Sequence, residues 1–215
     1  MTQLKNILSI SLCAAALGAC KNTNDAATAV GGQTDKQVKT LMLQQKWVSA
    51  CNKTGTLLSI FQIPSQTEKY DMGSSLQHTT TLSNDANCAT PLITITENGS
   101  YQVGDKVSDN VYALTLTYQS VAIMPVSPDG AQKLNDIKAC GFADWAAGAS
   151  KDVTAQSSAD YVVARCWIKT PRVIYDISEI DGDHIKFGLV QNGQDKSSVD
   201  KRPAAVDQSV VYSKQ

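Results

Sequence analysis

Short segments in which apolar and polar residues alternate are the feature of this chain that most constrains its fold. Residues 111–118 and 184–190 both carry apolar side chains at every second position. A period of two is typical of a β-strand that buries one face. The residues predicted to face the interior in these two segments are Tyr112, Leu114, Leu116, Ile185, Phe187 and Leu189. The chain is therefore predicted to be mainly β.

Turn and cap residues divide the rest of the chain into short elements. Asp181-Gly182-Asp183 predicts a hairpin between strands at 172–180 and 184–190, and Asn98-Gly99 predicts a second hairpin turn. Ser127 followed by Pro128 predicts a helix over residues 128–138. Further elements are expected as a short helix at 36–45 and as strands at 57–63, 74–82, 92–96, 121–126 and 208–213. About eight to ten strands with one or two short helices favour an antiparallel β-barrel, with a β-sandwich as the alternative.

The amino-terminal residues have the pattern of an export signal. Lys5 precedes an uncharged run at 7–17, which is too short to span a bilayer because a spanning helix needs about 20 apolar residues. The run ends in Leu17-Gly18-Ala19-Cys20, which resembles the bacterial lipobox. We expect residues 1–19 to be a lipoprotein signal peptide and Cys20 to carry the lipid. An ordinary signal peptide, cut after a small residue, is the alternative.

The segment that follows Cys20 predicts how the protein is held at a membrane. Residues 20–35 are small and polar and contain a Gly-Gly pair, which predicts a flexible tether before a single domain over residues 36–215. By resemblance to enterobacterial lipoproteins, Lys21 favours the bacterial outer membrane, on its periplasmic face or at the cell surface. The net charge of -1 gives no electrostatic reason to expect a nucleic-acid partner.

Four cysteines remain in the domain after the signal peptide and Cys20. An exported protein enters an oxidising compartment, in which an even number of cysteines predicts disulfides. Of the three possible pairings, we predict Cys51–Cys88 and Cys140–Cys166, since each would staple neighbouring strands through a loop of moderate length. A zinc site is the weaker alternative, because the chain contains neither a C-x-x-C pair nor a His-x-x-x-His pair.

The start of the domain resembles the first strand of lipocalins, in which a Gly-x-Trp motif places a Trp at the barrel bottom beneath an Arg. Trp47 matches the Trp, Gln45 stands in the place of the Gly, and Arg202 precedes the last predicted strand. The wider pattern of residues 47–51, 87–91, 99–104, 140–145, 175–177, 202–203 and 212 is similar to a family of uncharacterised, lipocalin-like bacterial lipoproteins. The resemblance implies a lipocalin-like barrel closed by Trp47 and Arg202, and the family brings no catalytic residue.

Motifs for chemistry are weak in this chain. His78 and His184 have no neighbouring nucleophile at a recognisable spacing, and the sequence contains no G-x-S-x-G, P-loop or H-E-x-x-H motif. Asp176 and Glu179 begin an acidic cluster, but they lie on opposite faces of a predicted strand and would not converge on calcium. We expect no enzyme, metal or cofactor, with a hydrolase as the remaining alternative.

The predicted function follows from the anchor and the barrel. We expect an envelope lipoprotein, attached to the membrane through its lipid, that binds a small apolar or amphipathic ligand with the inward-facing residues given above. The alternative is a protein-interaction module, such as an adhesin, inhibitor or scaffold part, whose barrel interior is filled with side chains.

Overall fold

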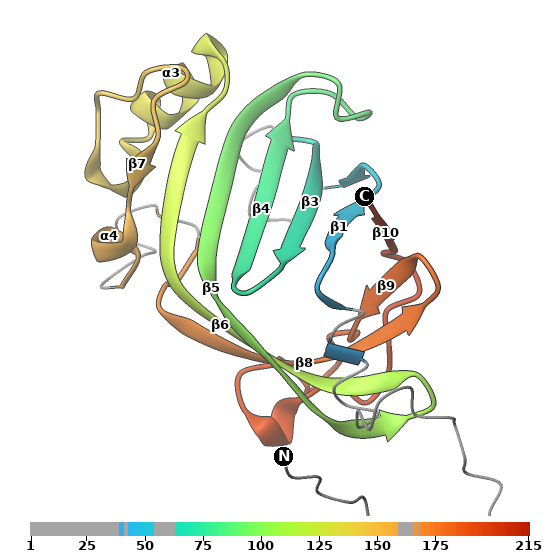
Figure 1. Ribbon diagram of the computed structural model, residues 1–215. Coiled ribbons are helices and arrows are strands. Elements are labelled where there is room, and N and C mark those ends of the chain that lie inside the picture. Colours follow the sequence, from blue (N-terminus) through green and yellow to red (C-terminus); the bar gives the residue numbers. More distant parts are fainter. Residues whose placement is uncertain (1–38, 41–42, 54–62, 159–165, 167) are drawn as a thin grey trace, which may run out of the picture. The chain divides into compact units, whose positions relative to one another are not determined.

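The computed structural model describes residues 39–40, 43–53, 63–158, 166 and 168–215 (Figure 1). All of these residues belong to one compact unit, Thr34–Gln215. The predicted signal peptide, Cys20 and the tether lie outside the described residues, as does the strand predicted at 57–63 except for Ile63. Half of the helix predicted at 36–45 is described, and Lys39, Thr40 and Leu43 within it are helical. No helix within the described ranges is long and apolar enough to cross a membrane.

Eight antiparallel strands form a closed barrel, which confirms the predicted barrel. Its order is β1-β10-β9-β8-β6-β5-β4-β3, and β1 closes the ring because it pairs with both β10 and β3. The strands are β1 (Lys46–Ser49), β3 (Ser65–Met72), β4 (Leu76–Ser83), β5 (Pro91–Ser108), β6 (Val111–Pro125), β8 (Arg172–Asp181), β9 (His184–Phe187) and β10 (Tyr212–Lys214). Two short strands extend the sheet: β2 (Asn52–Lys53) pairs with β3, and β7 (Lys151–Asp152) pairs with β6.

Two short helices, α3 (Pro128–Asp136) and α4 (Thr154–Ser158), lie with β7 beside one end of β6 (Figure 1). The predicted start of α3 is confirmed, since the Ser127 side chain accepts a hydrogen bond from the Gly130 N–H. There are also two single turns of 3-10 helix, η2 (Ala139–Gly141) and η3 (Val199–Lys201).

The two predicted hairpins have different outcomes. The turn between β8 and β9 is confirmed, because Asp181 pairs directly with His184. The turn predicted at Asn98-Gly99 is wrong: both residues lie inside β5, where the register to β6 shifts by a β-bulge. A side chain at Gly99 would overlap the carbonyl oxygen of Thr117 on β6. Gly99 therefore allows the backbones of β5 and β6 to approach closely at this point.

The buried side chains form two cores. One lies inside the barrel and contains five of the residues predicted to face inward, namely Tyr112, Leu114, Leu116, Ile185 and Phe187. Leu189, the sixth, lies beyond the end of β9 and is only partly buried. The second core lies between the ends of β4 to β6 and the segment from α3 to Val153, and includes Leu134 and Trp145.

Both predicted disulfides are confirmed. Cys51–Cys88 joins the end of β1 to the β4–β5 connection, with its Cα atoms 5.7 Å apart. Cys140–Cys166 lies in the second core, with its Cα atoms 4.8 Å apart. The two bridges close the loops around one end of the barrel and tie the helical segment to the residues before β8.

Candidate functional site

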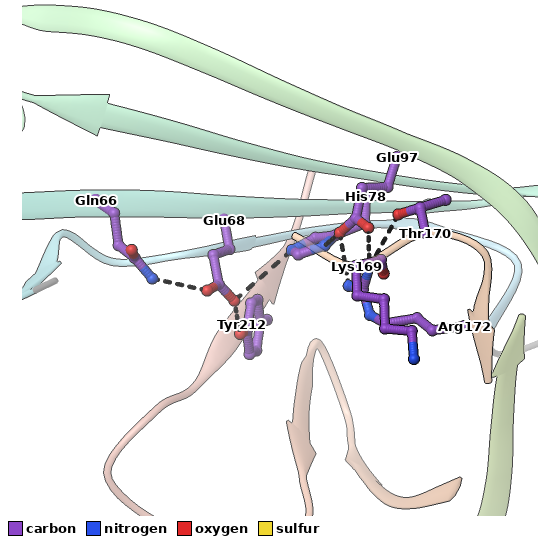
Figure 2. A network of polar contacts seen from close by, with 8 residues as sticks. All are labelled: Gln66, Glu68, His78, Glu97, Lys169, Thr170, Arg172 and Tyr212. Atoms are coloured by element: carbon purple, nitrogen blue, oxygen red, sulfur yellow. Dashed lines mark hydrogen bonds and ion pairs between the residues drawn. The ribbon is translucent and has the colours of Figure 1, made fainter. Parts of the chain in front are cut away.

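A layer of polar side chains crosses the barrel interior. The strand register places Tyr70 on β3 opposite His78 on β4, and His78 opposite Glu97 on β5. Arg172 on β8 comes next to this layer through β6, where it is the direct partner of Tyr118. Figure 2 shows the resulting chain of contacts, which links residues from strands that are far apart in the sequence.

Glu97 and Arg172 form the centre of this layer. The two guanidinium nitrogens of Arg172 each donate to one oxygen of Glu97, and the Nη2–Oε2 distance is 2.9 Å. The Glu97 side chain is only 2% exposed. Burial by itself would raise the pKa of Glu97, but the hydrogen bond from His78 and the charge of Arg172 outweigh burial and lower the pKa. Glu97 is therefore a buried carboxylate that stays charged because two partners hold it.

His78 connects this ion pair to a second carboxylate. Its Nδ1 lies 3.3 Å from Oε2 of Glu97, and its ring stacks on Tyr70 with a centroid distance of 4.2 Å. On the other side of the ring, Nε2 lies 3.9 Å from Oε2 of Glu68. This distance exceeds a hydrogen bond, and Nε2 has no hydrogen-bond partner among the described residues. His78 thus lies between the carboxylates of Glu97 and Glu68 and, of these two, is hydrogen-bonded only to Glu97.

Glu68 is held by neutral donors. Gln66 Nε2 donates to Glu68 Oε1 at 2.8 Å, and the Tyr212 hydroxyl donates to Oε2. Burial and the Glu68 carboxylate both raise the pKa of Tyr212, so its phenol remains protonated and keeps donating. The backbone N–H of Glu68 donates to the Ser49 hydroxyl at 2.9 Å, which fixes this part of β3 against β1.

A pocket with a volume of about 260 Å³ opens beside Glu68. Its wall combines aromatic and apolar side chains with charged ones, and five charged residues line it, three acidic and two basic. The lining residues are Asn52, Lys53, Gln66, Glu68, Tyr70, Asp176, Phe187, Gly188, Lys196, Asp207, Val210 and Tyr212. Glu68 therefore belongs both to the polar layer and to the pocket.

Asp176 holds another part of the pocket wall together. Its Oδ1 accepts from the N–H of Gly188 at 2.9 Å, and its Oδ2 accepts from Lys196 Nζ at 2.8 Å. Arg202 adds to this wall by donating to the backbone carbonyls of Leu114 and Asp176. These contacts attach the long segment after β9 to the barrel wall.

Both residues predicted to close the barrel, Trp47 and Arg202, have defined partners in the described structure. Trp47 is buried, and its indole N–H donates to the carbonyl of Leu43 at 3.2 Å. The Arg202 guanidinium lies over the ring of Tyr175, 5.8 Å from its centroid. Arg202 therefore helps to hold the segment after β9, and barrel closure by Trp47 and Arg202 stays a prediction.

The residues predicted to bind a ligand are mostly core residues. Of the six, only Phe187 lines the pocket. Tyr112, Leu114, Leu116 and Ile185 are at most 3% exposed and pack against other side chains of the barrel core. The alternation in sequence identified the inward face correctly but could not tell a filled part of the barrel from a hollow one. Glu68 and Lys196, which do line the pocket, were not among the candidates, and Asp176 was considered only as a calcium ligand.

Other candidate groups from the sequence lie away from this pocket. His184 is exposed at the start of β9, and Glu179 pairs with Lys186 at 3.4 Å. Within the described ranges, no group of three or more His, Cys, Asp or Glu side chains is arranged to hold a metal ion.

No protein-family model and no curated protein matches the chain. Its class is therefore defined by the fold and the site: a small, closed antiparallel β-barrel, consistent with a lipocalin-like barrel, with a charged pocket beside a buried polar layer.

Proposed function

We propose that this protein is an exported lipoprotein, anchored to the bacterial outer membrane through Cys20, whose barrel binds a small amphipathic molecule. The pocket beside Glu68 is the observation that carries the binding proposal, since it is concave and combines apolar surface with a few charged groups. The paired cysteines support export, because disulfides persist in oxidising compartments. The resemblance to lipocalin-like lipoproteins points in the same direction.

The lining of the pocket favours an amphipathic ligand over a purely apolar one. Phe187, Val210 and Tyr212 offer apolar surface, whereas Glu68 and Asp207 offer carboxylates. A purely apolar molecule would take these carboxylates out of water without giving them a partner, which is costly. A ligand with both an apolar and a polar part satisfies both sides of the wall.

A binding role fits the polar layer better than catalysis does. The ion-pair and ring partners of His78 within the described residues are Glu97, Glu68, Tyr70 and Tyr118, and none of these four is a serine or cysteine nucleophile. The Glu97–Arg172 pair satisfies buried charges, as a structural pair does.

The second candidate is the protein-interaction module with a filled interior. It is favoured by one observation: the barrel core around Leu114 and Ile185, each 0% exposed, is packed with side chains. Under this alternative the pocket would hold no ligand.

Pocket occupancy separates the two candidates. We expect native mass spectrometry of the protein purified from its own host to detect a retained small molecule. Val210→Trp is expected to fill the pocket and remove that molecule, because Val210 lines the pocket. Val199→Trp is the matched control, since Val199 is 61% exposed and lies outside the lining. An unoccupied protein, or equal retention in both variants, would contradict ligand binding in this pocket.

The anchor has its own test. Cys20→Ser is expected to move the protein from the membrane fraction to the soluble fraction, because the serine cannot accept the lipid through a thioether. Each buried CH₂ of an acyl chain contributes about 0.8 kcal/mol to membrane binding, so loss of the chains should release most of the protein. Fractionation followed by immunoblotting measures this. A variant that stays in the membrane fraction would refute lipid anchoring at Cys20.

A further inference from the structure

The charge of Glu68 is balanced differently from that of the other interior carboxylates. Glu97 pairs with Arg172, and Asp176 pairs with Lys196 at 2.8 Å. Glu68 accepts hydrogen bonds from neutral donors, and no Lys or Arg forms an ion pair with it in the described part of the chain. Its side chain is 22% exposed, toward the pocket that it lines. The pocket therefore contains a half-buried carboxylate whose nearest cationic candidate is His78, beyond hydrogen-bond distance.

Three aromatic rings lie beside this carboxylate. Tyr70 lies 4.8 Å from Phe187 and 5.4 Å from Tyr212, and Phe187 lies 5.2 Å from Tyr212, measured between ring centroids. All three line the pocket. Aromatic rings attract cations through the negative charge of their faces, and a carboxylate beside them adds a full opposite charge.

The remaining charges of the pocket do not offset Glu68. Lys196 is already held by Asp176, and its positive charge also helps to lower the pKa of Asp207. Asp207 is a further carboxylate, and hydrogen bonds from Ser209 lower its pKa despite partial burial, so it stays ionised at neutral pH. Lys53 is exposed on β2, where water screens its charge. An anionic ligand would therefore meet the Glu68 carboxylate, which has no Lys or Arg partner among the described residues, whereas a cation would meet complementary charge.

We infer that the ligand of this pocket is a small organic cation, an ammonium group with an apolar part, and that Glu68 is its anionic partner. The inference rests on the proposed function, because it assigns the chemical class of the molecule that the pocket binds. The ammonium lies beside the Glu68 carboxylate and the ring of Tyr212, and the apolar part lies toward Phe187 and Val210.

We test this assignment with pairs of ligands that have the same shape but differ in charge. Choline is compared with 3,3-dimethyl-1-butanol, and benzylamine with benzyl alcohol, while benzoate serves as the anion. Isothermal titration calorimetry with the mature chain is expected to give at least about tenfold tighter binding of a cation than of its neutral counterpart, a difference of about 1.4 kcal/mol. Benzoate is expected to bind more weakly than benzyl alcohol.

Glu68→Gln tests the partner, because it removes the charge and keeps the shape of the side chain. The variant is expected to lose at least about tenfold in affinity for the cation and to bind the neutral counterpart unchanged, which also demonstrates an intact pocket. Asp195→Asn is the matched control, since Asp195 carries an exposed carboxylate outside the pocket. The control is expected to bind the cation as the wild type does.

The outcomes distinguish this inference from the proposed function. Equal or tighter binding of the neutral or anionic compounds would overturn the cation assignment and leave a ligand pocket. The same conclusion would follow if the molecule retained from the host is neutral or anionic. If no test ligand binds and the host protein is unoccupied, the proposed binding function itself is refuted. A retained molecule that carries an ammonium group, and that is lost in Glu68→Gln, supports the inference.

Discussion

Replacing Arg172 by methionine is expected to lower the free energy of unfolding by about 3 kcal/mol at neutral pH. Methionine keeps much of the apolar stem, so the main loss is the guanidinium that donates to both oxygens of Glu97. The carboxylate of Glu97 then stays buried without Arg172, and among the described residues it keeps only its hydrogen bond with His78. The variant also loses the guanidinium 4.4 Å above the ring of Tyr118. Urea unfolding followed by circular dichroism measures the difference.

A double variant separates the ion pair from simple packing. Glu97→Gln combined with Arg172→Met removes both charges, so its cost is expected to be smaller than the sum of the two single costs by about 1–3 kcal/mol. Lys46→Met is the control for loss of a charge, because Lys46 pairs with Asp71 at 3.6 Å on the exposed side of the sheet. Its cost is expected to stay within about 1 kcal/mol. Strictly additive single costs would contradict a coupled pair.

The pH dependence of this loss has a definite sign. The folded state lowers the pKa of Glu97 below its ordinary value of 4.5, so the stability that Glu97 contributes is present above that value and disappears as the pH falls through the folded pKa. The difference between wild type and Arg172→Met is therefore expected to be largest at neutral pH and to shrink below about pH 4. A difference of equal size at both pH values would mean that the charge of Glu97 is not its cause.

The sequence was sufficient to predict a mainly β fold and to favour a barrel over a sandwich, because its strands carry apolar residues on one face. Tyr112, Leu114 and Leu116 on β6 follow this rule, and so do Ile185 and Phe187 on β9. The disulfides could be predicted as well, since four cysteines in an exported chain leave only three pairings. These features depend on local periodicity or on counting, and neither requires knowledge of which strands become neighbours.

The polar layer could not be predicted for the opposite reason. The strand β3 presents Gln66 and Glu68 to the interior, so it lacks the apolar alternation that identifies a strand, and it was not among the predicted elements. Glu97 and Arg172 are separated by 75 residues and meet only after the barrel closes. A charged residue inside a strand pattern is the one signal that could have indicated an interior polar group, but its partner is fixed by topology.

The turn predicted at Asn98-Gly99 failed because a glycine in a β pattern has two meanings. It can adopt the backbone of a tight turn, or it can allow another strand to approach closely. Gly99 has the second role: β5 continues to Ser108, and the register to β6 shifts between Asn98 and Gly99. In a short alternating segment Asn-Gly favours a hairpin. Here β6 is long enough to pair with β5 on both sides of Asn98-Gly99, so β5 continues through these residues.

Gly99→Ala is accordingly expected to lower the free energy of unfolding by about 2–3 kcal/mol, because the added methyl group would overlap the Thr117 carbonyl and crowd the backbone of Tyr118. These are backbone atoms of β6, so they cannot move aside without disturbing the hydrogen bonds between β5 and β6. Gly73→Ala is the matched control, since the nearest atom to its new Cβ is 3.9 Å away, and its cost is expected to stay within about 0.5 kcal/mol. Urea unfolding measures both costs, and amide hydrogen exchange is expected to show lower protection around Gly99 and Thr117. Wild-type stability and protection in Gly99→Ala would mean that the bulge does not depend on the missing side chain.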